Sequence, residues 1–210
     1  MINYIFENRC FICNKQTEND FFCSSCLEDF NFIPYKNFIK YNDNFYFDEV
    51  FTLLENNEVL KKAIHLYKFG NIRKLSVFFS KLILKRYKKS FFDKYDYVVP
   101  VPLHKKKLKK RGFNQTKKIL SEFLEEEKIF NFAFRARNTK QQSLIKSREE
   151  RKKNIFNVFE IEYDKINLIK NKKILLFDDI FTTGTTLNEL AKTFFYSEAQ
   201  KIDILIIGVS

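Results

Sequence analysis

Two adjacent carboxylates are the most chemically distinctive feature of this chain. Asp178 and Asp179 end an apolar run and precede a loop of threonines around one glycine, in the stretch ILLFDDIFTTGTT (174–186). The apolar run predicts a buried strand, and the residues after Gly184 predict a helix. In a parallel α/β sheet, ligands bind beyond the carboxyl ends of the strands. The stretch therefore predicts a binding site at a strand end.

The same stretch also indicates what kind of ligand binds. The first turn of a helix offers unpaired backbone N–H groups to a phosphate, and Gly184 lets the backbone approach that phosphate closely. Hydroxyl donors, which also cap the helix, come from Thr182, Thr183, Thr185 and Thr186. Two carboxylates accept hydrogen bonds from vicinal hydroxyls, so a sugar phosphate fits both halves. The stretch is neither a Walker loop nor G-x-G-x-x-G; the alternative is a capped helix beside two solvated aspartates.

All four cysteines lie near the N-terminus, in the pattern C-x2-C-x9-C-x2-C. Two such pairs can hold four thiolates around one tetrahedral zinc ion, with the ligands Cys10, Cys13, Cys23 and Cys26. Two disulfides or four free thiols are the alternatives, and disulfides are disfavoured in the cytosol. A site with four protein ligands leaves no open position, which predicts a structural and not a catalytic zinc.

A second anion-binding region follows a strand expected at 98–101, which ends in a stiff Pro-x-Pro turn. Residues 104–118 hold eight lysine or arginine residues and no acid. A basic turn at this strand end would face the same crevice as Asp178 and hold a pyrophosphate, with Mg²⁺ bridging pyrophosphate and ribose oxygens. His104 is interpreted as a structural turn residue and not a general base, because no catalytic partner is near it in sequence.

Several stretches in the same order resemble a known family. ILLFDDIFTTGTT resembles the phosphoribosyl pyrophosphate motif of the type I phosphoribosyltransferases. Together with the cysteine pairs, VVPVPLHKKKLKKRGFNQ (98–115) and RNTKQQSLIKSREERKKNIFNVF (137–159) resemble one branch of them, the ComF family. The resemblance implies a core parallel sheet and names the ligand, phosphoribosyl pyrophosphate with Mg²⁺. Proteins of this family are associated with DNA uptake during natural transformation, and the resemblance alone implies that role here.

The resemblance also implies further ligand-binding residues. A pyrophosphate-binding loop is implied at Val101, Pro102, Leu103 and His104, with Arg111 among the cations that follow it. A mobile loop that closes over the ligand is implied around Thr139, Gln142 and Arg151.

The periodicity of the chain predicts an α/β fold. In the last third, a strand at 173–179, a helix at 185–199 and a strand at 201–209 alternate, and the strands are apolar on both faces, as in a parallel sheet. Earlier elements are expected as a strand at 49–55 and helices at 57–70, 72–91 and 114–130. The chain then divides into a zinc module at 1–30, a connector and helical, hood-like region at 31–95, and a phosphoribosyltransferase-like domain at 96–210.

The net charge of +12 favours polyanionic partners, although abundant lysine also keeps a protein soluble. Cations gather at 104–118 and 135–153, and Phe113, Phe132 and Phe134 offer rings on which bases can stack. A track for single-stranded DNA is therefore predicted along Lys105, Lys106, Lys107, Lys109, Lys110 and Arg111.

Two functions compete on this evidence. The first is a phosphoribosyl-pyrophosphate-binding protein that handles single-stranded DNA together with DNA-uptake machinery. The second is a phosphoribosyltransferase that acts on an unidentified nitrogen acceptor; the sequence identifies no catalytic base. A plain structural zinc protein would leave the threonine loop unexplained. No apolar run approaches the roughly 18 residues of a membrane span and no secretory signal is visible, so a cytoplasmic location is expected.

Overall fold

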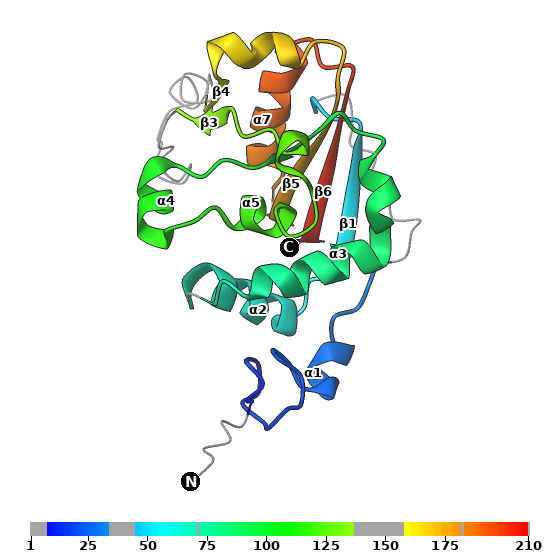
Figure 1. Cartoon of the computed structure of the whole chain (residues 1–210), viewed down its shortest axis with the longest axis vertical. Coiled ribbons are helices and arrows are strands. Elements are labelled where there is room, and N and C mark those ends of the chain that lie inside the picture. The colour runs from blue at the N-terminus through cyan, green and yellow to red at the C-terminus, as the bar shows by residue number, and fades with distance from the viewer. Residues whose placement is uncertain (1–7, 34–44, 71, 137–157, 182, 210) are drawn as a thin grey trace.

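The computed structural model describes residues 8–33, 45–70, 72–136, 158–181 and 183–209 (Figure 1). The elements follow one another as α1 (Ser24–Glu28), β1 (Glu49–Leu54), α2 (Glu58–Phe69), α3 (Leu75–Phe92), β2 (Tyr97–Pro100), α4 (Lys105–Arg111), α5 (Gln115–Leu120), η1 (Glu126–Lys128), β3 (Ala133–Arg135), β4 (Phe159–Ile161), η3 (Tyr163–Leu168), β5 (Lys173–Phe181), α7 (Thr185–Tyr196) and β6 (Lys201–Val209).

Four strands form one parallel sheet in the order β1-β6-β5-β2. β5 and β6 pair along their whole lengths, from Lys173 opposite Lys201 to Phe181 opposite Val209. Because all four strands run in the same direction, their carboxyl ends meet at one edge of the sheet, which we call the carboxyl edge. The expected parallel α/β fold is confirmed.

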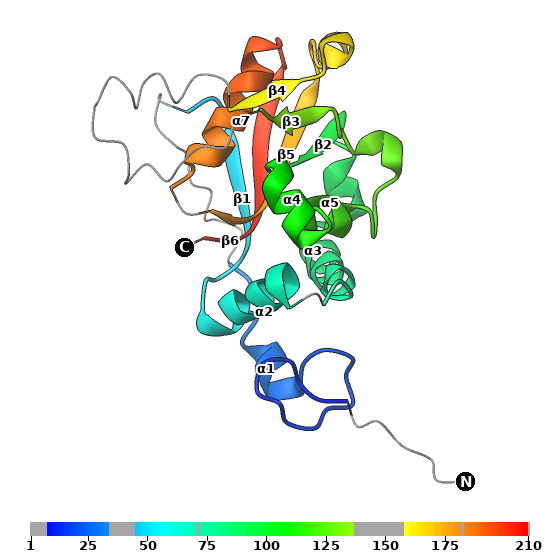
Figure 2. The same ribbon diagram turned by 90° about the vertical axis from the view of Figure 1, so that its left-hand side faces the viewer.

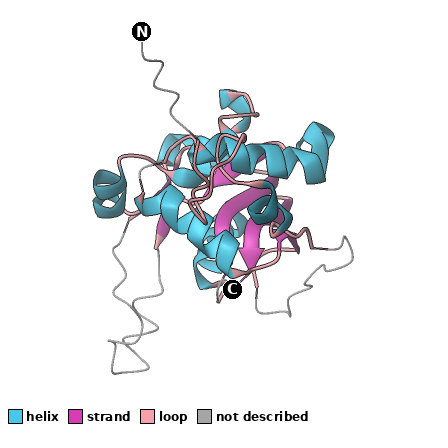
Figure 3. Cartoon of the chain, turned by 90° about the horizontal axis from the view of Figure 1, so that it is seen from below, coloured by secondary structure: helices cyan, strands magenta, loops and turns pink. Residues whose placement is uncertain are grey.

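Both faces of the sheet are covered, which explains why its strands are apolar at successive positions. Leu175 and Phe177 of β5 pack with the core of α2, α3 and α5. Ile174 and Leu176 pack with the core of α7 and the β3–β4 pair. Figure 2 shows these layers from the side, and Figure 3, seen from below, shows the strands enclosed between helices.

The cysteine-containing segment packs on the same body. The Phe22 and Phe30 rings lie 4.7 and 4.9 Å from the ring of Phe78 on α3, measured between centroids. β1, within the region expected as a connector, pairs with β6 as an edge strand of the main sheet. The described residues of the 1–30 and 31–95 segments thus share a core with residues that follow them.

Two helices differ from the sequence-based expectation. The helix expected at 114–130 ends at Leu120, because the chain must return to the sheet, where the Phe130 N–H donates to the Val98 carbonyl. The basic turn expected after residue 104 is instead the helix α4. Gly112 ends α4 in the left-handed conformation, at φ 79°, and its N–H donates to the Leu108 carbonyl.

Candidate functional site

The carboxyl edge brings the two aspartates beside the turn that follows β2. Pro100 lies opposite Phe177 in the β2–β5 pair, and the Val101 N–H donates to the Phe177 carbonyl at 3.0 Å. Asp178 and Asp179 follow immediately, and β5 continues through them to Phe181. The predicted ribose-binding residues and the predicted pyrophosphate loop are therefore neighbours in space.

Asp179 is held by side chains from two helices. It is 4% exposed, its carboxylate lies 2.8 Å from the Lys68 ammonium of α2, and it accepts a hydrogen bond from Gln115 Nε2 at 3.2 Å. The Gln115 backbone carbonyl accepts from the Tyr67 hydroxyl, and its side-chain carbonyl accepts from Arg111. Asp179 is thus neutralised and fixed within the protein.

Asp178 has a different environment. Among the described residues its carboxylate accepts one hydrogen bond, from the Asp179 backbone N–H at 2.9 Å, and makes no ion pair. Burial first, and the neighbouring Asp179 charge second, raise the pKa of Asp178 to about 7, against the opposing charges of Lys68 and Arg135. Asp178 therefore retains oxygen atoms that can accept hydrogen bonds from a ligand.

The threonine loop leads into α7 at an uncapped helix start. Gly184 is the N-cap residue at φ 70°, and a Cβ at this position would lie 2.5 Å from the Phe181 ring. Glycine is required here by the backbone conformation and by this close contact. Among the described residues no side chain caps α7, so the capping expected of Thr183, Thr185 and Thr186 is not found, and the Thr183 and Thr185 hydroxyls bond each other at 2.9 Å.

Other helices that follow strands of the sheet do have side-chain caps. Asn57 caps α2 and His104 caps α4. Within the described ranges the first-turn N–H groups of α7 have no such acceptor, and threonine hydroxyls lie beside them, so this turn can receive an anion. Thr186 is exposed in the same turn, and Thr182 lies outside the described residues.

The turn after β2 is anchored to α5. The Val101 carbonyl accepts from Asn114 Nδ2 at 3.0 Å, and Val101 and Pro102 are buried, whereas Leu103 is partly buried. His104 Nδ1 accepts from the Lys106 N–H at 3.2 Å, which is the structural role that the sequence predicted. The turn is held rigidly next to Asp178.

The basic residues of α4 lie on an exposed helix. Lys105, Lys106, Lys107, Lys109 and Lys110 are exposed, and Arg111 is partly buried. Within the described part of the chain no ion pair involves an α4 lysine, so their charges are available to an external anion. Burial lowers the pKa of Arg111, and the Asp179 charge opposes that effect.

The four cysteines form a compact cluster. Their sulfur atoms all lie within 4.8 Å of one another, and a tetrahedral zinc with Zn–S bonds of about 2.3 Å places its sulfurs about 3.8 Å apart. A hydrogen bond from Ser25 and others from Cys26 and the neighbouring thiols lower the pKa of Cys23 to about 6, whereas burial raises that of Cys26. The cluster can hold a metal ion such as zinc.

Some residues were not identified as part of the site from sequence. The two aspartates are surrounded by Lys68, Gln115 and Arg135. The sequence could not predict the Lys68 contact, because a lysine in an amphipathic helix is usually solvated. Gln115 lay in a stretch that resembled the family and was not assigned a role. The implied loop residues Thr139, Gln142 and Arg151 lie outside the described residues.

The three aromatic residues expected to stack bases are placed differently. Phe113 is partly buried against Tyr67, with centroids 5.5 Å apart. Phe132 packs on Phe130 at 5.3 Å, and Phe134 is 37% exposed on β3. They do not form one surface with α4, because Phe113 packs in the core of the α2–α3–α5 face and Phe132 in that of the α7 face.

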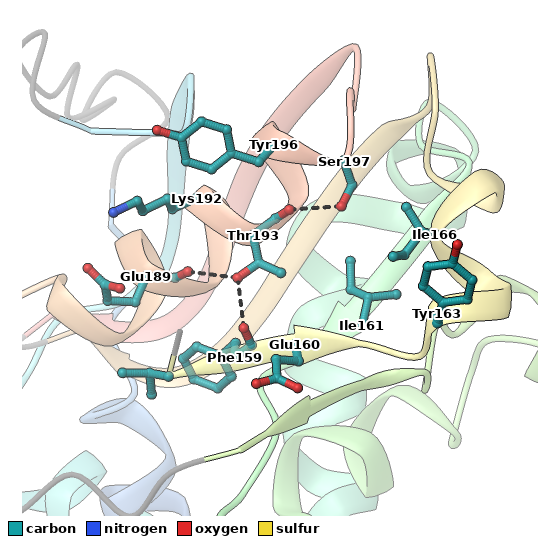
Figure 4. A pocket seen from close by; sticks show the side chains of 11 residues that line it. Phe159, Glu160, Ile161, Tyr163, Ile166, Glu189, Lys192, Thr193, Tyr196 and Ser197 are labelled. Atoms are coloured by element: carbon teal, nitrogen blue, oxygen red, sulfur yellow. Dashed lines mark hydrogen bonds between the residues drawn. The ribbon is translucent and has the colours of Figure 1, made fainter. Parts of the chain in front are cut away.

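A cavity of about 520 Å³ lies elsewhere, between β4, η3 and α7 (Figure 4). The Thr193 hydroxyl donates to backbone carbonyls of Phe159 and Glu189, and Ser197 donates to the Thr193 carbonyl. Its charged residues are two acids and one lysine, Glu160, Glu189 and Lys192. This cavity therefore lacks the cationic character expected of a phosphate site.

Comparisons with known proteins agree with the motifs. Competence protein F of Haemophilus influenzae is 34% identical over 98 residues, which are 45% of this chain and 42% of that protein. Competence protein ComFC of Streptococcus pneumoniae is 34% identical over 145 residues, or 65% and 57%. DNA utilization protein YhgH of Escherichia coli is 27% identical over 152 residues, or 69% and 65%.

The chain thus spans between 42 and 65% of the length of these relatives. No protein-family model matches the chain. Among its described helices, none combines the length and apolar character needed to cross a membrane.

Proposed function

We propose that this chain, whose similarity to competence proteins supports its membership of the ComF family, binds phosphoribosyl pyrophosphate with Mg²⁺ at the carboxyl edge and handles single-stranded DNA. One observation carries the ligand proposal: Asp178 lies at the strand end that leads into α7, and in the described part of the chain it accepts one hydrogen bond and no side chain caps that helix. One strand–loop–helix unit therefore contains both a carboxylate that can accept hydrogen bonds from ribose hydroxyls and a helix start that can bind a phosphate.

The 5-phosphate occupies the first turn of α7. Its oxygens accept from backbone N–H groups there and from the hydroxyls of Thr183, Thr185 and Thr186. The positive φ of Gly184 turns the chain so that the first N–H groups of α7 follow directly after β5. A helix N-terminus also favours a dianion through its partial positive charge.

The ribose hydroxyls donate to Asp178. Asp179, which is committed to Lys68 and Gln115, fixes the backbone from which Asp178 extends. The Asp178 carboxylate is also a hard oxygen ligand of the kind that Mg²⁺ prefers, and substrate phosphates supply most ligands of that ion. The turn at residues 101–104 and Arg111 receive the pyrophosphate.

The DNA part of the proposal rests on α4 and on the relatives. Six of its seven residues are cations and none is an acid. Relatives named for competence and for DNA utilization favour a nucleic acid as the polyanion. Phosphate contacts of this kind are sequence-independent and weaken steeply with salt.

The ligand proposal is tested by thermal unfolding with phosphoribosyl pyrophosphate and Mg²⁺. A ligand at a hundredfold excess over Kd stabilises the native state by about 2.7 kcal/mol, which raises the Tm of a chain of this size by about 5 to 10 °C. Asp178→Asn should abolish this rise while the variant stays folded, because the substitution removes a charge that burial disfavours.

Asp96→Asn is the matched control, since Asp96 lies before β2, at the opposite end of that strand from the site, and pairs with Lys172. Its ligand-dependent rise should equal that of the wild type. An unchanged rise in Asp178→Asn would remove the assignment.

We also propose that the cysteine cluster holds one structural zinc. Metal analysis of protein purified without chelator should find about one zinc per chain. The metal should stabilise the cluster and its aromatic neighbours against unfolding. Absence of zinc, with four freely titratable thiols in the folded protein, would contradict this assignment.

A further inference from the structure

An exposed aromatic ring lies where α2 ends. Phe69 is 60% exposed, although most phenylalanines of the described chain are buried or partly buried. The Arg111 guanidinium carbon lies 5.2 Å from its ring centroid, and the His65 ring lies 5.0 Å away. Single exposed hydrophobic residues are common on protein surfaces, so the distinguishing feature of Phe69 is the Arg111 guanidinium that lies over its ring.

The charge around Phe69 is strongly positive. Arg111 is the last residue of α4, whose lysines are exposed and unpaired within the described residues. Lys68, the residue before Phe69, is committed to Asp179. The ring therefore lies at the end of a row of cations that can neutralise successive backbone phosphates.

A second exposed aromatic surface shows that exposure alone is not the signal. Tyr163 and Tyr196 are 91% and 67% exposed at the cavity in Figure 4. Their charged neighbours in that cavity are Glu160, Glu189 and Lys192, so a phosphate backbone would meet more negative than positive charge there. Of these two surfaces, the one at Phe69 combines an aromatic face with excess positive charge.

We propose that Phe69 is a stacking platform for a base of single-stranded DNA whose backbone runs along α4. The inference rests on the DNA role proposed above and names a residue that this role uses. Proteins that bind single strands combine a basic track with aromatic side chains on which bases stack. Arg111 contributes to both, because its guanidinium faces the ring and its charge lies at the end of the track.

A cavity next to the ring provides space for the stacked base. It measures about 300 Å³ and is lined by Asn56, Lys61, Ile64, His65, Lys68, Phe69 and Ile180. Two of these residues are lysines and none is an acid, so the cavity suits a base that is attached to a phosphate backbone.

The first experiment uses the absence of tryptophan from the chain. Phe69→Trp places the single tryptophan of that variant at the proposed platform, and Tyr163→Trp places it at the acidic surface. Oligothymidylate should quench the fluorescence of Phe69→Trp and leave that of Tyr163→Trp unchanged. Equal quenching of both variants, or quenching of neither while DNA binds, would overturn the proposal.

The second experiment separates stacking from phosphate contact. Binding of oligothymidylate and of an abasic oligonucleotide of the same length is measured for the wild type, Phe69→Leu and Tyr163→Leu. Phe69→Leu should bind oligothymidylate about 5- to 100-fold more weakly and bind the abasic strand as the wild type does. Tyr163→Leu should bind both strands like the wild type.

The outcomes distinguish the two proposals. If the wild type binds DNA in a salt-dependent way but Phe69→Leu weakens both strands equally or neither, stacking at Phe69 is wrong and the DNA role stands. If the wild type binds neither strand, both the DNA role and the stacking proposal are wrong. The phosphoribosyl pyrophosphate site is tested separately, by thermal unfolding.

Discussion

The parallel sheet contains aspartates toward both of its ends, and they are partnered differently. Asp203 lies near the start of β6, is fully buried, and accepts from the Tyr95 hydroxyl at 2.8 Å and from Lys201 at 2.9 Å. Asp178 lies near the end of β5 and accepts only one hydrogen bond, from the next backbone N–H, among the described residues. Burial raises the pKa of both carboxyl groups.

This difference separates a structural acid from one available to a ligand. The two partners of Asp203, Tyr95 and Lys201, are protein side chains at the amino end of the sheet. At the carboxyl edge, Asp179 has comparable partners in Lys68 and Gln115, but Asp178 does not. The Asp178 carboxylate is partly exposed and has no cation partner within the described residues, so a ligand can supply its hydroxyl donors and Mg²⁺ there.

The largest effect is expected from Lys68→Met. The Lys68 and Asp179 side chains are 21% and 6% exposed, so the substitution leaves a buried charge without its cation. We expect a loss of about 2 to 3 kcal/mol in the free energy of unfolding, measured in urea. Lys68 also lowers the pKa of Asp178, so ligand affinity near pH 7 should fall as well.

Lys61→Met is the control on the same helix. Lys61 pairs with Glu58 at 2.8 Å, but the two side chains are 52% and 90% exposed. Removal of such a surface pair should change stability by about 0.5 kcal/mol or less. Equal losses in the two variants would show that the Lys68 contact is an ordinary surface ion pair.

A separate effect on stability is expected from pH. Asp178 ionises near pH 4 when unfolded and near pH 7 when folded, so the folded state binds the extra proton between these values. The contribution of Asp178 to stability therefore falls as pH rises from about 4 to about 7, and stays low above that. Urea unfolding of Asp178→Asn should lack this decline.

Ligand affinity should change in the opposite direction. Only the ionised Asp178 accepts both ribose hydroxyls and Mg²⁺, and its ionised fraction rises about tenfold between pH 6 and pH 8. Affinity for phosphoribosyl pyrophosphate should rise by about that factor. The same titration with Asp178→Asn measures how its residual affinity changes with pH, which reports the titration of the ligand's own phosphates. Identical pH profiles of affinity in the wild type and in Asp178→Asn would exclude Asp178 as the titrating group.

The sequence predicted the sheet and the central strand–loop–helix unit because their signals are local. Apolar runs bounded by Asp178 and Gly184 specify a strand, a turn and a helix within thirteen residues. The cysteine pairs were equally local, and their sulfur atoms do converge. His104 caps α4, a contact that could not be predicted before the helix was known.

The contacts that distinguish Asp178 from Asp179 could not be predicted. Lys68 lies 111 positions from Asp179 in sequence and Gln115 lies 64 positions away. Both reach Asp179 only because α2 and α5 pack on the same face of the sheet. The end of α5 at Leu120 also depends on a contact that is distant in sequence. The Phe130 N–H donates to the Val98 carbonyl of β2, so the chain has to leave the helix before it reaches Phe130.

A smaller loss than in Lys68→Met is expected from Lys201→Met, at the other end of the sheet. Lys201 pairs with Asp203 as Lys68 does with Asp179, but it is 38% exposed and also contacts Glu49 at 3.1 Å. Water can replace part of this contact, and Asp203 keeps the Tyr95 hydroxyl, so a loss of about 1 kcal/mol is expected. The thermal shift with phosphoribosyl pyrophosphate should equal that of the wild type. A reduced shift in Lys201→Met would mean that both ends of the sheet contribute to ligand binding, and the distinction between a structural and a ligand-binding acid would be lost.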